Sequence, residues 1–183
     1  MPLPPDQLAN ALRKLQAIAF DVDGVLTDGM LTWSPLGKEY KTFSFTDIMG
    51  ISLLRRLGIK MALVSGERSA HVDRYAEKMH IQHVIKGTRD KAGAMRNFAG
   101  KLNLSLARTC YFGDDVNDLF AMELAGLSAC PANAAQEVLD YVEPRGFVSQ
   151  RSGGHGAVRE LTDAILAARK LTGREVFLMS PPD

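Results

Sequence analysis

The 183-residue chain lacks the features that mark membrane, nucleic-acid-binding and disulfide-bonded proteins. No apolar run approaches the roughly 18 residues of a membrane span, and residues 1–16 lack the basic start and apolar centre of a signal peptide. With 22 Lys and Arg against 21 Asp and Glu, the net charge of +1 gives no general attraction for nucleic acid or an anionic membrane. Cys110 and Cys130 lie in apolar stretches without CxxC or Cys/His spacing, which favours reduced core thiols. We therefore expect a cytoplasmic protein.

Short apolar runs alternate with helical patterns along most of the chain. Strands are expected at 17–20, 60–64, 83–85, 109–112, 127–130 and 141–142, with helices between them and at 6–15 and 157–170. Between 30 and 45, two strand-like arms flank a turn, which predicts a β-hairpin. This alternation is typical of an α/β, three-layer, doubly wound fold with a mostly parallel sheet. We expect one domain over 1–183, with a core at 16–172 and a flexible tail at 173–183.

Polar side chains gather where the expected strands end. Because parallel strands present their carboxyl ends at one edge of a sheet, these groups should meet. They are Asp21, Asp23, Ser65, Lys91, Asp114, Asp115 and Asp118, and Gly66 adds a backbone N–H beside Ser65. Two acids two residues apart repel unless a proton or a cation intervenes, so the D-x-D predicts Mg²⁺. Taken alone, the D-x-D also fits a solvated acidic loop, Ser65-Gly66 a turn, Lys91 a surface lysine and residues 113–118 a capped helix start. The order of these motifs along one sheet favours a functional site.

The chain resembles the haloacid dehalogenase (HAD) superfamily of phosphatases in four ordered motifs, at 20–27, 64–66, Lys91 and 113–118. By this resemblance Asp21 is the nucleophile, and Asp23 protonates the leaving alcohol and then activates water. Gly24, Ser65, Gly66 and Lys91 would hold the phosphate. Mg²⁺ would be bound by Asp21, the backbone carbonyl of Asp23, and Asp114, with Asp115 and Asp118 behind them. A carboxylate nucleophile with a metal and a lysine suits phosphoryl transfer on independent grounds.

The segments between the motifs leave no room for a cap domain. Residues 28–46 provide only a hairpin, and residues 65–91 only a helix and a short strand. An active site that excludes water then needs another cover, and a neighbouring subunit would supply it.

Within the capless group, the chain is similar to the 3-deoxy-D-manno-octulosonate 8-phosphate (Kdo 8-phosphate) phosphatase-like family. The residues that carry this resemblance are 21–29, 37–43, Asp47, 50–51 and 153–160. The resemblance implies a phosphoric monoester hydrolase of Kdo and lipopolysaccharide biosynthesis and a homotetramer. It also implies that the glycine-rich segment 151–156 belongs to a tail that closes over a neighbour's site. Without the resemblance, that segment fits a flexible loop before the last helix.

Three positions bear on the substrate. Thr46-Asp47-Ile48 stands where the octulosonate branch usually has Arg-Asp-Gly, and Glu67 where it usually has arginine. Glu67 with Lys78 resembles relatives acting on KDN 9-phosphate or N-acetylneuraminate 9-phosphate, although both also fit a solvated helix face. We expect Asp47, Glu67 and Lys78 to bind substrate, with Kdo 8-phosphate preferred.

Two other classes of protein are alternatives to the hydrolase. A phospho-accepting receiver domain also clusters acids and a lysine on a doubly wound sheet, but its phosphorylated aspartate lies on a middle strand and not on the first. An inactive interaction domain would not need the complete set of catalytic positions.

Overall fold

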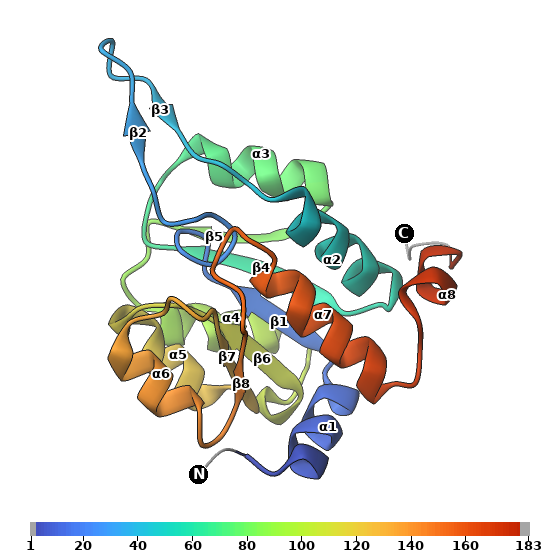
Figure 1. Cartoon of the computed structure of the whole chain (residues 1–183). Helices are drawn as coiled ribbons and strands as arrows, with labels where there is room; N and C mark the ends of the chain where they lie inside the picture. The colour runs from blue at the N-terminus through green and yellow to red at the C-terminus, as the bar shows by residue number, and fades with distance from the viewer. Residues whose placement is uncertain (1–2, 180–183) are drawn as a thin grey trace.

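A six-stranded sheet forms the centre of the protein, and the computed structural model describes residues 3–179 (Figure 1). The strand order is β5-β4-β1-β6-β7-β8, and every pairing is parallel. The strands are β1 (Ala17–Phe20), β4 (Lys60–Ser65), β5 (His83–Lys86), β6 (Thr109–Phe112), β7 (Leu127–Cys130) and β8 (Phe147–Val148). The α/β, doubly wound architecture expected from the sequence is confirmed.

Helices cover both faces of the sheet, because alternate residues of each strand point to opposite sides. Ile18 and Phe20 pack into one core, whereas Ala17 and Ala19 pack into the other. The first core is covered by α1 (Pro5–Lys14), α2 (Phe45–Arg56), α3 (Ala70–Met79) and α7 (Ala157–Ala168). The second is covered by α4 (Lys91–Lys101), α5 (Leu119–Leu124) and α6 (Gln136–Val142). Among the helices described, none has the length and apolar character that crossing a bilayer would take.

Side-chain caps fix the helix starts on the active-site edge. Ser69 caps α3 and Asp90 caps α4, as their positions before the helical patterns predict. Ser44 caps α2, because its side chain accepts hydrogen bonds from the backbone N–H groups of Thr46 and Asp47 in the first turn. Two single turns of 3₁₀ helix, η1 (Leu106–Arg108) and η2 (Val116–Asp118), flank β6.

Two expectations near the C-terminal end are corrected. Residues 141–142 belong to α6, and the last strand is β8. Residues expected in the flexible tail instead form α8 (Gly173–Phe177), because a capping box between Thr172 and Glu175 starts the helix and Val176 is fully buried against Leu53 and Leu166. The remainder of the expected tail, 180–183, lies outside the described residues.

The predicted hairpin is present and replaces a cap domain. It consists of β2 (Thr32–Trp33) paired antiparallel with β3 (Glu39–Tyr40), and it extends away from the body of the protein (Figure 1). Its side chains include exposed apolar groups, with Trp33 63% and Leu36 96% exposed.

Candidate active site

Four segments bring the predicted polar groups together at the carboxyl edge of the sheet. Asp21 follows β1, Ser65 ends β4, Lys91 opens α4, and Asp114 follows β6. Because β1 lies between β4 and β6, its loop is flanked by the loops of both neighbours. The fold therefore explains why residues from distant parts of the sequence converge here.

A buried lysine joins two of the acids. The Lys91 ammonium lies 3.0 Å from Asp21 Oδ1 and 2.8 Å from Asp118 Oδ1, and the Lys91 side chain is only 3% exposed. It also donates to Asn117 Oδ1 at 3.2 Å. Carboxylate oxygens of Asp21, Asp114 and Asp118 all lie within 4.8 Å of one another.

Asp118 holds this arrangement together. One of its oxygens accepts hydrogen bonds from Lys91 and from the Tyr111 hydroxyl at 2.8 Å, and the other accepts from the backbone N–H groups of Asp114 and Asp115. Both oxygens of this fully buried side chain are thus occupied. Asp118 is a support for the site, and Asp115 caps the turn η2.

The electrostatics of the cluster favour a bound cation. Burial, with the nearby charge of Asp118, raises the pKa of Asp21 well above its usual range and that of Asp114 to about 7. Burial alone would lower the pKa of Lys91, but the carboxylates of Asp21 and Asp118 outweigh this effect and raise it. Three ionised carboxylates and one ammonium would carry a formal charge of minus two.

Asp114 supplies the test of whether a metal fits. Its Oδ1 is buried and has no hydrogen-bond partner within residues 3–179. A buried polar atom without a partner is costly, and a carboxylate oxygen is a ligand that Mg²⁺ prefers. A divalent cation beside Asp21 and Asp114 would both satisfy this atom and balance the charge of the cluster.

The structure adds Lys41, for which the sequence predicted no role. Its ammonium lies 2.5 Å from Asp23 Oδ1, with the lysine side chain 6% and the aspartate side chain 33% exposed. Asp23 is thus partly open to solvent, at the end of the loop after β1. The signal available in the sequence was weak, because a lysine 18 positions away reaches Asp23 only through the return of the hairpin.

The loop after β1 depends on glycine. Gly24 has a φ of +89°, and a Cβ at this position would lie 2.0 Å from Asp114 Oδ2. Residue 24 must therefore lack a side chain for the loops of β1 and β6 to approach one another. This contact places Gly24 directly beside the acidic cluster.

The second motif lies at the end of β4. Ser65 is buried, and its hydroxyl accepts a hydrogen bond from the backbone N–H of Glu67 at 3.1 Å. Gly66 and Glu67 are exposed. Lys78 lies on the last turn of α3, with its ammonium 5.8 Å from the centre of the Phe45 ring. It lines a hollow together with Ile48, Met49, Ser52 and Arg55 of α2.

Asp47 does not lie where a substrate contact was expected. It is fully buried, and its two oxygens accept hydrogen bonds from the backbone N–H groups of Gly156 at 2.9 Å and Arg159 at 3.0 Å. These donors belong to the unpaired first turn of α7, which has no side-chain cap of its own. Asp47 therefore anchors α7 to α2, which does not agree with the predicted role in binding substrate.

The glycine-rich segment 151–156 packs on the active-site loop of its own chain. Gly154 N–H donates to the Val25 carbonyl at 3.0 Å, and Gly153 N–H donates to Asn133 Oδ1 at 2.9 Å. A Cβ on Gly153 would lie 1.7 Å from the Gly24 carbonyl oxygen. The segment is thus fixed by hydrogen bonds and close backbone packing, which corrects the alternative of a flexible loop.

Comparison with known proteins agrees with this geometry. Residues 80–144 match the model of the haloacid dehalogenase-like hydrolases. The 3-deoxy-D-manno-octulosonate 8-phosphate phosphatase KdsC of Escherichia coli (strain K12) is 32% identical over 168 residues, which cover 92% of this chain and 87% of that protein. KdsC of Yersinia pestis is 32% identical over 169 residues, covering 92% and 89%.

Two similar solved structures are also of octulosonate 8-phosphate phosphatases. The 3-deoxy-D-manno-octulosonate 8-phosphate phosphatase from Moraxella catarrhalis, in complex with magnesium, phosphate and KDO, has a TM-score of 0.86 and 33% identity, covering 94% of this chain and 97% of that one. The cobalt-bound phosphatase from Haemophilus influenzae has a TM-score of 0.85 and 32% identity, covering 92% and 99%.

Proposed function

Because the chain belongs to the 3-deoxy-D-manno-octulosonate 8-phosphate phosphatase family of haloacid dehalogenase-like hydrolases, we propose that it hydrolyses Kdo 8-phosphate to Kdo and phosphate with Mg²⁺. The observation that carries this function is the cluster of Asp21, Asp114 and Lys91. It supplies a nucleophile, metal ligands and a cation at one buried point, in a chain that resembles the magnesium-, phosphate- and KDO-containing structure over nearly its whole length.

Asp21 is the nucleophile in this proposal. Lys91 holds its Oδ1 at 3.0 Å and so fixes the orientation of the carboxylate before the substrate arrives. An oxygen of Asp21 forms a bond to phosphorus as the bond to the sugar oxygen breaks, which gives an aspartyl phosphate. Mg²⁺, when held by Asp21, Asp114 and the Asp23 carbonyl, would neutralise charge on the phosphoryl oxygens and the carboxylates.

Asp23 moves the protons in both steps. It donates one to the leaving sugar oxygen and then accepts one from the water that hydrolyses the aspartyl phosphate. Its 33% exposure allows it to reach substrate and water, and Lys41 orients its carboxylate. Ser65, with Gly66 and Glu67 beside it, lines the approach to the phosphate.

The proposal also includes the oligomeric state of the protein and its cellular compartment. The whole chain acts as one hydrolase domain, in the cytoplasm, as a homotetramer in which a neighbouring subunit covers the site. Exposed apolar side chains on the hairpin and the start of α2 support an interface there, because such groups are seldom left to solvent in a patch. They are Met30, Trp33, Leu36, Tyr40 and Phe45.

Phosphate release from Kdo 8-phosphate, KDN 9-phosphate and N-acetylneuraminate 9-phosphate, measured side by side, tests the substrate. We expect Mg²⁺-dependent turnover with the highest kcat/KM for Kdo 8-phosphate, and loss of turnover in Asp21→Asn. A higher kcat/KM for either nine-carbon substrate would transfer the assignment to that sugar. Turnover that survives Asp21→Asn would remove the proposed nucleophile, and phosphate trapped on another aspartate would favour a receiver domain.

A further inference from the structure

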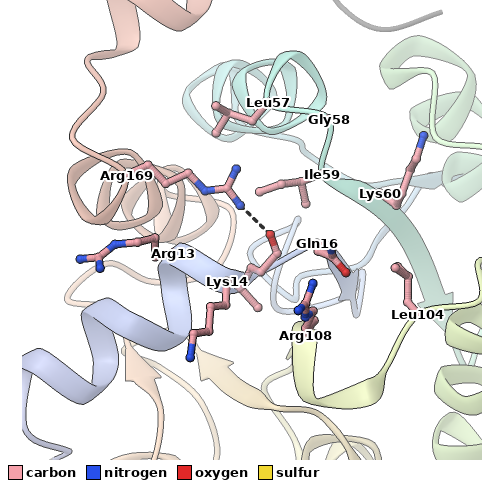
Figure 2. Close-up of a pocket in the computed structure, with 11 residues that line it drawn as sticks. Arg13, Lys14, Gln16, Leu57, Gly58, Ile59, Lys60, Leu104, Arg108 and Arg169 are labelled. Carbon is pink, nitrogen blue, oxygen red and sulfur yellow. Dashed lines mark hydrogen bonds between the residues drawn. The ribbon is translucent and has the colours of Figure 1, made fainter.

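A basic surface hollow lies at the edge of the sheet opposite to the active site (Figure 2). It has a volume of about 610 Å³, and its lining includes five cationic residues and no acidic one. We call it the basic hollow, and its cations are Arg13, Lys14, Lys60, Arg108 and Arg169. Gln16, Lys60 and Arg108 stand at the starts of β1, β4 and β6, whereas the active-site residues follow the ends of these strands.

The charge of the basic hollow is not balanced by carboxylates. Within residues 3–179, none of its five cations forms an ion pair. Two of them contact helix ends, where carbonyl groups attract cations: Arg13 donates to the Ala168 carbonyl at 3.0 Å, and Arg169 to the Leu15 carbonyl at 2.5 Å. No such contact accounts for Lys60 and Arg108.

The excess of positive charge in the hollow includes a partly buried group, the guanidinium of Arg169. Its Nε is buried and has no hydrogen-bond partner among the described residues, and burial lowers its pKa. A partly desolvated guanidinium without a carboxylate is costly, and an anion nearby would offset this cost. In Figure 2, the Arg169 side chain extends toward the middle of the hollow, and Arg108 lies below it.

The shape of the hollow suits a small molecule. Its volume falls within the range of about 300–1,000 Å³ that is usual for ligand sites. Leu15 and Ile59, both nearly fully buried, form apolar parts of its wall. Guanidinium groups bind phosphate through paired N–H donors, and several cations around one hollow favour a ligand with adjacent charges.

We propose that the basic hollow binds a small polyanion that carries a diphosphate group, at a position separate from the phosphate site at Asp21. Arg108 and Lys60 supply positive charge that forms no ion pair within the described residues, and Arg169 adds a partly buried guanidinium to the same lining. The proposal concerns a second site and does not depend on which sugar phosphate the enzyme hydrolyses.

Calorimetric titration with pyrophosphate, in EDTA and at constant ionic strength, tests the site. The test pair Lys60→Ala/Arg108→Ala is compared with the control pair Arg145→Ala/Arg174→Ala, which also removes two exposed cations, at positions outside the hollow and the active site. We expect saturable binding to the wild type, at least ten-fold tighter than that of inorganic phosphate. The test pair should weaken it at least ten-fold, and the control pair less than two-fold, with Kdo 8-phosphate turnover retained in both.

Three results would overturn the proposal: no saturable binding of pyrophosphate to the wild type, equal affinities for pyrophosphate and phosphate, or equal affinities for pyrophosphate in the test and control pairs. Retained turnover shows that the test pair is folded. If it is not retained, the single variant Arg108→Gln, at an exposed position, replaces the pair and must weaken pyrophosphate binding at least three-fold.

Discussion

The contact between Gly24 and Asp114 gives a sharp test of how the site is assembled. In Gly24→Ala the new Cβ would lie 2.0 Å from Asp114 Oδ2, whereas unstrained contacts of carbon require about 3.5 Å. The carboxylate must therefore move by more than about 1 Å, and a misplacement of about 1 Å near a reacting centre can cost about 10²-fold in rate. We expect kcat/KM for Kdo 8-phosphate to fall about 10²-fold, together with weaker Mg²⁺ activation.

Gly58→Ala is the matched control. Gly58 also has a positive φ, of +73° against +89° at Gly24, but a Cβ there meets no atom within 4 Å. Both substitutions incur the backbone cost of a left-handed residue, about 1–2 kcal/mol. Only Gly24→Ala displaces the Asp114 carboxylate. Steady-state kinetics over a range of Mg²⁺ concentrations, with urea denaturation to compare stabilities, separates the two effects. If Gly24→Ala retained kcat/KM within two-fold of Gly58→Ala, the reasoning would be refuted.

Other changes probe the anchor, the metal ligands and the proton-transfer group. Asp47→Asn should lower the free energy of unfolding in urea by about 2 kcal/mol, because one backbone donor loses its charged acceptor. The control Asp163→Asn, at an exposed position, should lower it by under about 1 kcal/mol. Equal losses in the two variants would contradict the role of Asp47 as an anchor of α7. Because the pKa of Asp114 is raised to about 7 from 3.8, the folded protein without metal binds the extra proton, so its stability should fall as pH rises from about 4 to 7. Mg²⁺ should then raise the melting temperature more at pH 8 than at pH 5. Asp114→Asn should reduce both the fall in stability with pH and the pH dependence of stabilisation by Mg²⁺. An unchanged pH dependence of stability in that variant would exclude Asp114 as its source. Lys41→Met should reduce kcat about ten-fold or more through misorientation of Asp23. Lys101→Met, at an exposed position at the end of α4, should not, and equal kcat values in the two variants would exclude this role.

The sequence predicted those parts of the site that depend on local pattern. Buried strands of four to six residues, each followed by a polar turn, place Asp21, Ser65 and Asp114 at one edge once the sheet is parallel. Capping residues such as Ser69 and Asp90 are also read from nearby sequence. The bounds of the strands 17–20, 109–112 and 127–130 follow from these signals, whereas the order of the strands in the sheet comes from the structure.

Contacts between distant segments were not predictable in the same way. Asp47 accepts hydrogen bonds from residues 109 and 112 positions away, and nothing in its own neighbourhood distinguishes a buried anchor from a substrate ligand. The predicted strand at 141–142 failed because two apolar residues at the end of a helix have the same pattern as a short strand. Tertiary packing decides whether two such apolar residues end a helix or form a short strand.

The position of the glycine-rich segment changes where the cover of the site should be sought. Gly153 approaches the Gly24 carbonyl so closely that a Cβ on it would lie 1.7 Å from the carbonyl oxygen. The Gly154 N–H donates a hydrogen bond to the Val25 carbonyl. Through Asp47, the same segment is fixed to α2. If segment 151–156 moved to a neighbouring subunit, it would expose the loop that carries Asp21 and Asp23, and Asp47 would lose the Gly156 N–H, one of its two backbone donors. In the proposed homotetramer, a cover from a second subunit would therefore come from another segment. The hairpin extends from the body with Trp33 and Leu36 exposed, and it is the segment that we propose for this role (Figure 1).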